Sequence, residues 1–575
     1  MVKEEIKNVI QQACLNLHFE VEEIALEHPE NTEHGDYSTN VALALAKQLG
    51  RSPREVAELI ISKLEIEHLK FLDSVKAEGP GFINFSLSKE YLFSTLQDIQ
   101  KKKEEYGRGS SKKGEKVIVE FTDPNPFKEF HIGHLYSNIV GESLSRLFEA
   151  TGATVKRANY QGDVGLHVAK AMWGMTKALG HNMPKDKDSL QEKVKWMGMC
   201  YAAGALAYEK DEQVRQEIVE LNGKIFAQDK TIKALYQKGR KWSLEYFETI
   251  YKRLGTKFDY YYFESEVGKT GLTLVRKWLE KGIFEKSQGA VVFSGEKYGL
   301  HSRVFINSLG LPTYEAKELG LAPTKYKDFK YDLSVIITGN EIIDYFKVLL
   351  AALKEIDPSL AGKTRHLSHG MIRLPEGKMS SRTGSVITAE SLLDEVRARV
   401  TRVMGSSEIE IPAKEKEETA EAISLGAVKY SLLRVSLGKD IIFDFDKSLS
   451  LEGESGPYLQ YTYARCKSIL RKAKLNQAKL KFNEIKFTAE ETALLRLLYR
   501  FEEIVQEAAK KFSPNLVCNF VFDLAQRYNL FYNTTSVLKA DTEGAKNFRL
   551  LLTASVAQVL ENGLSLLGIK TLERM

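Results

Sequence analysis

The sequence predicts an α/β protein with an added all-α part: a doubly wound parallel-sheet domain between a small N-terminal α+β domain and a C-terminal helix bundle. Three observations predict it. At 575 residues, the chain exceeds what one hydrophobic core usually supports, so several domains are expected. A short β-branched strand, an amphipathic helix and a second strand follow one another between residues 117 and 160. From Glu417 onward, apolar residues recur at helical spacing.

Composition excludes several classes of protein. Hydrophobic residues at 43% and charged residues at 28% are typical of a globular protein and too apolar for a largely disordered one. The net charge of +5 permits a nucleic-acid partner without indicating one. No segment has the apolar run that a membrane span requires, and the first residues lack the apolar core of a signal peptide. We therefore expect a cytoplasmic protein that makes no membrane contact.

The cysteines predict neither a metal site nor a disulfide framework. Cys14, Cys200, Cys466 and Cys518 are too widely spaced for a zinc-binding pair. A disulfide framework is implausible in a chain of this length. We expect four buried thiols and no protein-bound metal.

The N-terminal domain is expected over residues 1–105. It opens with a helical pattern and later reaches a Gly-Pro-Gly turn at residues 79–81, followed by the strand-like alternation of residues 82–85. The lysine-rich residues 101–114 are expected to form a linker, although a charge run is more often a solvated face.

The central domain is expected over residues 106–395. Residues 117–121 form a β-branched run suited to a buried strand, and a helical pattern extends from His134 to about Ala150. Residues 154–160 return as a strand. A strand–helix–strand unit of this kind predicts a parallel sheet with a right-handed crossover, which is the start of a Rossmann-type nucleotide-binding domain.

The remainder of the chain is expected to be mainly helical. Residues from about 167 to 290 are helix-rich and charged and are interpreted as an insertion, and the sheet pattern resumes at residues 332–337. We expect a connecting helical region over 396–455 and a helix bundle over 456–575. A strand-like run at residues 440–445 interrupts the helical periodicity.

His131, Gly133 and His134 form the first motif, His-Ile-Gly-His, where the loop after the first strand meets a helix. A helix N-terminus binds phosphate through its free N–H groups and its dipole, and two imidazoles can donate to ATP oxygens. Glycine between them lets a nucleotide approach the backbone. A lone tetrapeptide also fits a pair of ordinary histidines at a helix start.

The second motif follows Gly377 and comprises Lys378, Met379, Ser380 and Ser381. A lysine on a loop can neutralise charge that develops on a leaving pyrophosphate, while hydroxyls and backbone amides hold the loop in place. A polar surface turn is the alternative interpretation. Both motifs surround one predicted sheet, so we predict that His131, His134 and Lys378 are catalytic. The predicted ATP-binding residues are His131, Gly133, His134, Lys378, Met379, Ser380 and Ser381.

These two motifs resemble the ATP site of class I aminoacyl-tRNA synthetases, and other segments resemble the arginine-specific members of that family. The similar segments are residues 120–128, 159–165, 314–322, 456–465 and 573–575. Residues 35–37 and 79–84 resemble the extra N-terminal domain of those enzymes, which touches the tRNA elbow. Asp123, Val164 and Glu318 depart from the family pattern, where serine, tryptophan and aspartate are usual.

The resemblance implies ATP-dependent activation of L-arginine and its transfer to the 3′-terminal adenosine of tRNA(Arg), with release of AMP and diphosphate. It implies ATP with Mg²⁺ as the substrate complex, and we expect a monomer. A carboxylate at the end of a strand can grip the planar guanidinium with two parallel hydrogen bonds. The predicted arginine-binding residues are Glu120, Asp123, Asn125, Tyr314 and Glu318.

Aromatic and basic residues of the C-terminal bundle could stack on unpaired anticodon bases. The predicted tRNA-binding residues are Tyr458, Gln460, Tyr461, Arg465 and Tyr532. Aromatic residues at helical spacing are more often core, so about half of those in this region are expected to be buried.

Three other functions stay open at this point. A class I synthetase for another amino acid would share both motifs, and so would a nucleotidyltransferase whose helical part binds no RNA. A non-catalytic RNA-binding scaffold is disfavoured by the intact histidine and lysine motifs.

Overall fold

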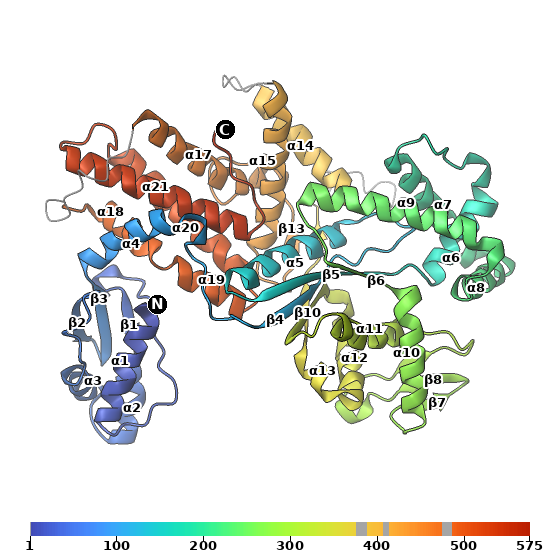
Figure 1. Ribbon diagram of the computed structural model, residues 1–575, viewed down its shortest axis with the longest axis horizontal. Helices are drawn as coiled ribbons and strands as arrows, with labels where there is room; N and C mark the ends of the chain where they lie inside the picture. Colours follow the sequence, from blue (N-terminus) through green and yellow to red (C-terminus); the bar gives the residue numbers. More distant parts are fainter. Residues whose placement is uncertain (1, 375–387, 406–412, 474–485) are drawn as a thin grey trace.

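The computed structural model describes residues 2–374, 388–405, 413–473 and 486–575. Figure 1 shows the N-terminal domain at one end of the molecule and the parallel sheet near its centre. The C-terminal helices contact both parts, since α21 packs against α4 of the N-terminal domain and against α5 of the sheet domain.

The N-terminal domain is a three-stranded antiparallel sheet covered by helices. The strand order is β1-β3-β2. Its elements are α1 (Val2–Asn16), β1 (Tyr37–Thr39), α2 (Val41–Leu49), α3 (Pro53–Ser62), β2 (Leu72–Glu78), β3 (Phe82–Leu87) and α4 (Lys89–Lys102). Ser52 and Glu55 form a capping box at the start of α3, and Pro53 occupies the first helical turn, where its missing N–H costs no hydrogen bond.

The central sheet has five parallel strands in the order β11-β10-β4-β5-β6. They are β4 (Lys116–Glu120), β5 (Thr154–Gln161), β6 (Tyr260–Phe263), β10 (Leu333–Gly339) and β11 (Thr364–His369). The strand order reverses at β4, which lies between β5 and β10. In doubly wound sheets this switch point, at the carboxyl ends of the strands, is where ligands bind. The predicted Rossmann-type fold is confirmed.

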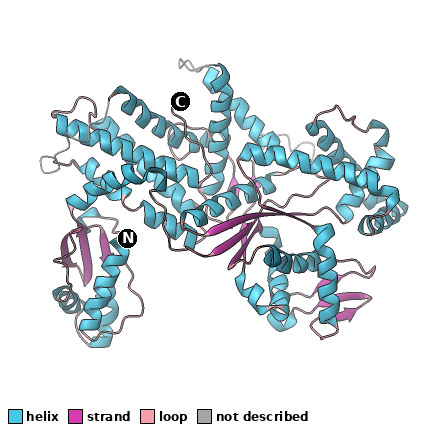
Figure 2. Cartoon of the chain, viewed as in Figure 1, coloured by secondary structure: helices cyan, strands magenta, loops and turns pink. Residues whose placement is uncertain are grey.

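Helices cover both faces of this sheet (Figure 2). Successive side chains of a strand point to opposite faces, and those of β4 enter two apolar clusters. Val117 and Val119 pack in one apolar cluster with α5 (Ile132–Ala150), whose Leu135, Ile139 and Leu144 are buried as expected. Ile118 faces a second cluster on the opposite side. That side carries α10 (Glu264–Leu279), α11 (Tyr314–Asp328), α12 (Ile343–Ile356) and α13 (Pro358–Lys363).

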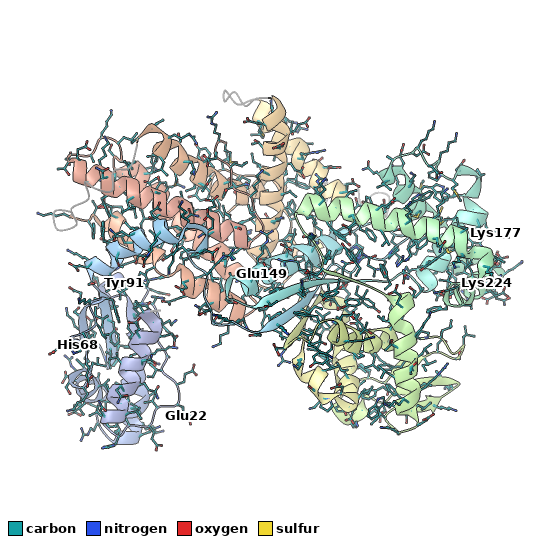
Figure 3. All side chains as sticks on the ribbon, viewed as in Figure 1. Glu22, His68, Tyr91, Glu149, Lys177 and Lys224 are labelled. Carbon is teal, nitrogen blue, oxygen red and sulfur yellow. The ribbon has the colours of Figure 1, made fainter. Side chains whose placement is uncertain are left out.

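Charged pairs attach α5 to the neighbouring strand. Arg157 of β5 donates to Glu142 at 2.9 Å and to Glu149 at 2.6 Å, both on α5. Figure 3 labels Glu149 near the end of this helix, close to the sheet. The α5 helix is therefore held by ionic contacts as well as by its apolar face.

The helical insertion follows β5, but a strand of the central sheet interrupts the range expected for it. It contains α6 (Leu166–Trp173), α7 (Leu190–Lys210), α8 (Glu212–Phe226) and α9 (Lys230–Leu254). Within the expected range of 167–290, β6 (Tyr260–Phe263) returns to pair with β5. The sequence did not predict β6, because a four-residue aromatic run gives little periodicity and its partner strand lies about a hundred residues earlier. A small antiparallel sheet of β7 (Glu285–Ser287), β8 (Ala290–Phe293) and β9 (Arg303–Ile306) then follows α10.

The rest of the described chain is almost entirely helical, as expected. It contains α14 (Ala389–Gly405), α15 (Ala413–Leu433), α16 (Phe445–Ser448), α17 (Gly456–Lys472), α18 (Ala489–Leu498), α19 (Phe501–Lys510), α20 (Asn515–Thr534) and α21 (Glu543–Leu566). The short parallel pair β12 (Ile372–Arg373) and β13 (Ile441–Ile442) is the exception. All four cysteines are buried free thiols. Over the described ranges, no helix combines the length and apolar character needed to cross a membrane.

The N-terminal domain docks on the C-terminal helices through buried polar contacts. The fully buried carboxylate of Asp36 lies 3.0 Å from Nε of Arg496 on α18, and its other oxygen accepts from the backbone N–H of Leu87. The Tyr37 hydroxyl donates to Glu503 on α19. The Gly-Asp-Tyr segment therefore faces another domain rather than solvent.

Candidate active site

The two motif histidines cap the N-terminus of α5. Nδ1 of His131 accepts from the backbone N–H groups of Gly133, at 3.1 Å, and His134, at 3.4 Å. The backbone N–H of His131 donates to Nδ1 of His134, and the two rings stack with centroids 3.6 Å apart. Because Nδ1 of each ring is an acceptor, a neutral ring carries its proton on Nε2. Each histidine therefore offers an Nε2–H donor to a ligand.

Both histidines are neutral at physiological pH. Burial, assisted by the charge of Lys128, lowers the pKa of His131 to about 4. Burial and the neighbouring His131 hold the pKa of His134 well below its ordinary value. Lys128 was not assigned a role from the sequence, although it lies three residues before the first histidine. Its Nζ lies 4.5 Å from the ring centroid of Tyr201.

Lys378, Met379, Ser380 and Ser381 lie outside the described residues. The described chain resumes beside the histidines, because Thr388 forms an isolated β-bridge with His131. The backbone N–H of Ala389 also donates to the carbonyl of Phe130 at 2.8 Å.

The loop between β4 and α5 has a strained backbone. Thr122, Asp123 and Phe127 have positive φ angles of 81°, 46° and 66°, and such angles are unfavourable for residues with a Cβ, above all for a β-branched threonine. The Thr122 backbone N–H donates to Oγ of Ser137 at 2.9 Å, and that of Phe127 donates to Oγ of Ser243 at 2.9 Å. These contacts hold the loop in place. Asp123 and Asn125 belong to this held loop, which joins Glu120 at the end of β4 to the histidines of α5.

Glu120 ends β4 as a buried carboxylate that already has a cationic partner. Its side chain is 1% exposed, and Nζ of Lys325 lies 2.5 Å from Oε2. Lys325, on α11, also donates to Oγ of Ser334 at 3.2 Å. The sequence reasoning missed Lys325, which is separated from Glu120 by 205 positions.

Asp123 and Glu318 lie close to Glu120. The Asp123 carboxylate accepts from the backbone N–H of Tyr160 at 2.8 Å. Burial, followed by the charge of Glu120, raises the pKa of Asp123 and of Glu318 well above their ordinary values. The three carboxylates therefore form one acidic cluster, in which Glu120 and Glu318 are buried and Asp123 is half-buried.

A second buried ion pair, between Glu264 and Lys317, adjoins this cluster. Their side chains are 5% and 3% exposed. Nζ of Lys317 lies 4.2 Å from the ring centroid of Tyr314, which is exposed at the start of α11. A Cβ added to Gly162 would lie 2.5 Å from Oδ1 of Asn125 and 3.4 Å from Oε1 of Glu264. The glycine therefore allows these two side chains to approach the same strand end. The sequence reasoning missed Glu264.

The charges of this site are not balanced. Among the residues just described, the four carboxylates of Glu120, Asp123, Glu264 and Glu318 face the two ammonium groups of Lys317 and Lys325. Buried carboxylates are stable as anions only when they are paired. Asp123 and Glu318 have no ion-pair partner among these residues, and their raised pKa favours the protonated forms when no ligand is bound. A positively charged ligand would favour their ionised forms.

Asp163, in the turn after β5, has a structural role. Its buried carboxylate accepts from the backbone N–H of Ser265 at 2.9 Å, from Oγ of Ser265 at 2.8 Å and from Nε of Arg240 at 3.0 Å. These contacts join the turn to α9 and α10. Over the described ranges, no group of three or more His, Cys, Asp or Glu side chains could hold a metal ion.

An aromatic and basic cluster lies on the surface of the C-terminal helices. The guanidinium carbon of Arg465 lies 4.9 Å from the ring centroid of Tyr461 and 5.0 Å from that of Tyr532. Tyr532 is 41% exposed. The Tyr458 hydroxyl accepts from Nδ2 of Asn529 at 2.9 Å, and Asn529 also contacts Arg465. We call these residues, Tyr458, Tyr461, Arg465 and Tyr532, the aromatic cluster.

The structure contradicts a tRNA contact for Gln460. Its side chain is fully buried, and its amide donates to the carbonyls of Ala422, at 3.1 Å, and Lys570, at 2.7 Å. It therefore packs α17 against α15 and the C-terminal residues. The expected split among the aromatic residues is confirmed, because Tyr463, Tyr528 and Phe531 are core residues.

Family models match nearly the whole chain. Residues 95–445 match the tRNA synthetases class I (R) catalytic domain, residues 459–575 the DALR anticodon binding domain, and residues 1–87 the arginyl tRNA synthetase N terminal domain. The chain is 33% identical to an arginine–tRNA ligase of Treponema denticola, covering 96% of this chain and 95% of that protein. It is 31% identical to an arginine–tRNA ligase of Borrelia hermsii, covering 100% and 99%.

Solved structures agree with these matches. An arginyl-tRNA synthetase of Thermus thermophilus superposes with a TM-score of 0.84 at 25% identity, covering all of both chains. A methionyl-tRNA synthetase of Mycobacterium tuberculosis shares the fold, with a TM-score of 0.51 at 15% identity over 79% of this chain and 91% of that one. The chain therefore belongs to the arginyl-tRNA synthetases, the arginine-specific enzymes of the class I aminoacyl-tRNA synthetase family.

Proposed function

We propose that the chain activates L-arginine with ATP to arginyl-adenylate and transfers the arginyl group to the 3′-terminal adenosine of tRNA(Arg), releasing AMP and diphosphate. The observation that carries this proposal is the acidic cluster at the carboxyl end of β4, the end of the strand from which the chain passes to the two histidines at the start of α5. Arginine carries a guanidinium and an ammonium group, which can pair with the two carboxylates that have no lysine partner.

Five residues bind arginine in this proposal. Because Lys325 occupies Oε2 of Glu120, the other oxygen is left to accept from the guanidinium. The positive charge of the bound substrate favours the ionised forms of Asp123 and Glu318, whose pKa is raised in its absence. Asn125, whose Oδ1 lies beside Gly162, and the exposed ring of Tyr314 hold the remaining polar groups of the substrate.

The ATP phosphates bind at the N-terminus of α5. His131 and His134 donate through Nε2, and Gly133 lets the phosphates approach the backbone. Lys378 stabilises the leaving pyrophosphate, together with Met379, Ser380 and Ser381; these roles rest on the sequence. Mg²⁺ arrives with ATP as the substrate complex. The arginine carboxylate attacks the α-phosphorus, so the protein supplies positioning and charge rather than a covalent intermediate.

The tRNA contacts come from the two ends of the chain. The aromatic cluster of Tyr458, Tyr461, Arg465 and Tyr532 stacks on anticodon bases, since an exposed ring or guanidinium can pack on any base. Residues 1–105 touch the tRNA elbow. The catalytic part spans 106–395, the connecting helices 396–455 and the anticodon-binding part 456–575. We infer a cytoplasmic monomer.

Aminoacylation of total tRNA with each standard amino acid in turn tests this function. Arginine alone should be transferred. Transfer of another amino acid would make the chain a class I synthetase of different specificity. A gel shift with total tRNA distinguishes a synthetase from a nucleotidyltransferase that acts on a small acid, since the nucleotidyltransferase would leave the tRNA unshifted.

A further inference from the structure

The hydroxyl of Tyr160 is a buried polar group that the proposed function does not use. Tyr160 lies near the end of β5, and its side chain is 9% exposed. Within the described part of the chain, its hydroxyl has no hydrogen-bond partner. Burying a hydroxyl in this way is unfavourable, so native structures rarely do it without a reason.

Strand geometry directs Tyr160 to the same face of the sheet as Glu120. Glu120 and Ala158 are register partners in β4 and β5, and Tyr160 follows Ala158 by two positions. Residues two apart on a strand share a face. Tyr160 and Ala158 accordingly lie in the apolar cluster that packs beneath α10 and α11, the helices that carry Glu264 and Glu318.

Three acids of the proposed arginine site belong to the elements that meet on this face of the sheet. Glu120 ends β4, Glu264 begins α10 and Glu318 lies on α11. Glu264 and Glu120 each have one oxygen paired with a lysine. Burial raises the pKa of Tyr160 well above the ordinary value, and the charges of Glu264 and Glu318 raise it further. A positively charged ligand held by these acids would therefore lie on the same face of the sheet as Tyr160.

An apolar ring alone would fill this position. Tyr160 packs with Val267 and Leu319, which need only a phenyl ring as a neighbour. A core tyrosine usually justifies its hydroxyl by a hydrogen bond to the protein. Here the hydroxyl needs another explanation, and the acidic cluster supplies one.

We propose that the Tyr160 hydroxyl accepts a hydrogen bond from the guanidinium of bound arginine, which makes Tyr160 a specificity-determining residue. A guanidinium has five N–H donors and no acceptor, so every group that recognises it must accept. The Tyr160 hydroxyl is left for this role, because no protein group within the described part of the chain uses it. This inference rests on the proposed arginine site.

The variant Tyr160→Phe tests this inference, because its Tm and its Michaelis constant for arginine should respond differently. The variant loses a hydroxyl without a protein partner, so its Tm should stay equal or rise. The Michaelis constant for arginine should rise roughly tenfold or more, the loss expected for one hydrogen bond to a charged group. The constant for ATP should not change. Tyr106→Phe is the matched control, because the Tyr106 hydroxyl donates at 2.9 Å to the carbonyl of Leu498, at the end of α18. It should lower Tm and leave the arginine constant unchanged.

Inhibition of the arginine reaction by butylguanidine, which carries a guanidinium without an α-ammonium group, identifies the group contacted. Its inhibition constant should rise in Tyr160→Phe by the same factor as for arginine. An effect on arginine without one on butylguanidine would overturn the guanidinium contact. A lower Tm with an unchanged arginine constant would overturn the role altogether. Glu120→Gln, measured in parallel, distinguishes failure of the proposed arginine site from failure of the Tyr160 inference. If both variants bind arginine normally, the arginine site itself is misplaced. If only Tyr160→Phe binds arginine normally, the inference about Tyr160 alone is rejected.

Discussion

Nζ of Lys325 lies 2.5 Å from Oε2 of Glu120, and the two side chains are 2% and 1% exposed. The pair joins α11 to the end of the first strand of the parallel sheet. It gives the buried Glu120 carboxylate a cationic partner and occupies one of its two oxygens.

Glu120→Gln should raise the Michaelis constant for arginine steeply while that for ATP changes little, because the variant keeps the volume but loses the charge. Leaving a buried charge unpaired typically costs ~2–5 kcal/mol, so catalytic efficiency should fall at least roughly tenfold. Steady-state charging of tRNA measures it. Glu149→Gln is the control, since that carboxylate is 40% exposed and pairs with Arg157 away from the site. If Glu120→Gln charges tRNA with wild-type efficiency, Glu318 becomes the next candidate for recognition of the guanidinium.

Lys325→Met should destabilise the fold by ~3–5 kcal/mol, because it leaves the buried Glu120 carboxylate without its cation. Urea unfolding measures the loss. The double variant Lys325→Met/Glu120→Gln removes both charges and should recover most of that stability. Additive losses in the double variant would show that the two side chains are not coupled.

The stability contributed by His131 should decline as the pH falls from about 6.5 to about 4. Its pKa is lowered to about 4 in the folded chain, against ~6.5 when unfolded, so the unfolded state binds more protons in that window and stability rises with pH. Comparing urea unfolding of wild type and His131→Asn at pH 7 and pH 5 isolates this contribution. The wild type should lose ~1–2 kcal/mol more than the variant. Parallel losses in the two proteins would mean that His131 titrates normally.

Lys378→Ala should slow adenylate formation far more than it weakens arginine binding, because its ammonium acts as charge develops on the leaving pyrophosphate. The expected loss of transition-state stabilisation is ~2–4 kcal/mol. Single-turnover activation measures the rate, and equilibrium binding measures the ground state. An unchanged activation rate would exclude this role.

Removal of residues 1–87 should leave arginine and ATP binding intact and raise the Michaelis constant for tRNA. This deletion retains α4, whose Leu92, Leu96 and Ile99 are buried and which packs on the C-terminal helices. Asp36→Asn provides a milder test, since it weakens the contact with Arg496. It should make the N-terminal domain more sensitive to proteolysis without altering arginine binding. An unimpaired tRNA constant in the deletion would count against a tRNA role for this domain.

The sequence by itself determined the features that depend on local pattern. A β-branched run predicted β4 and helical spacing predicted α5, and the buried Leu135 and Ile139 follow the helical pattern. The position of His131 at a helix start and of Glu120 at a strand end also followed from neighbouring residues. Such features need no knowledge of distant segments.

Only the tertiary structure decided which distant side chains meet. Lys325 reaches Glu120 across 205 positions, and no local pattern singles out one lysine among many. Gln460 and Tyr461 are adjacent on one helix, yet Gln460 turns inward to backbone carbonyls while Tyr461 faces Arg465. The side of a helix that becomes buried depends on the helices packed against it, and long-range packing and charge pairing therefore decided the partners in the site.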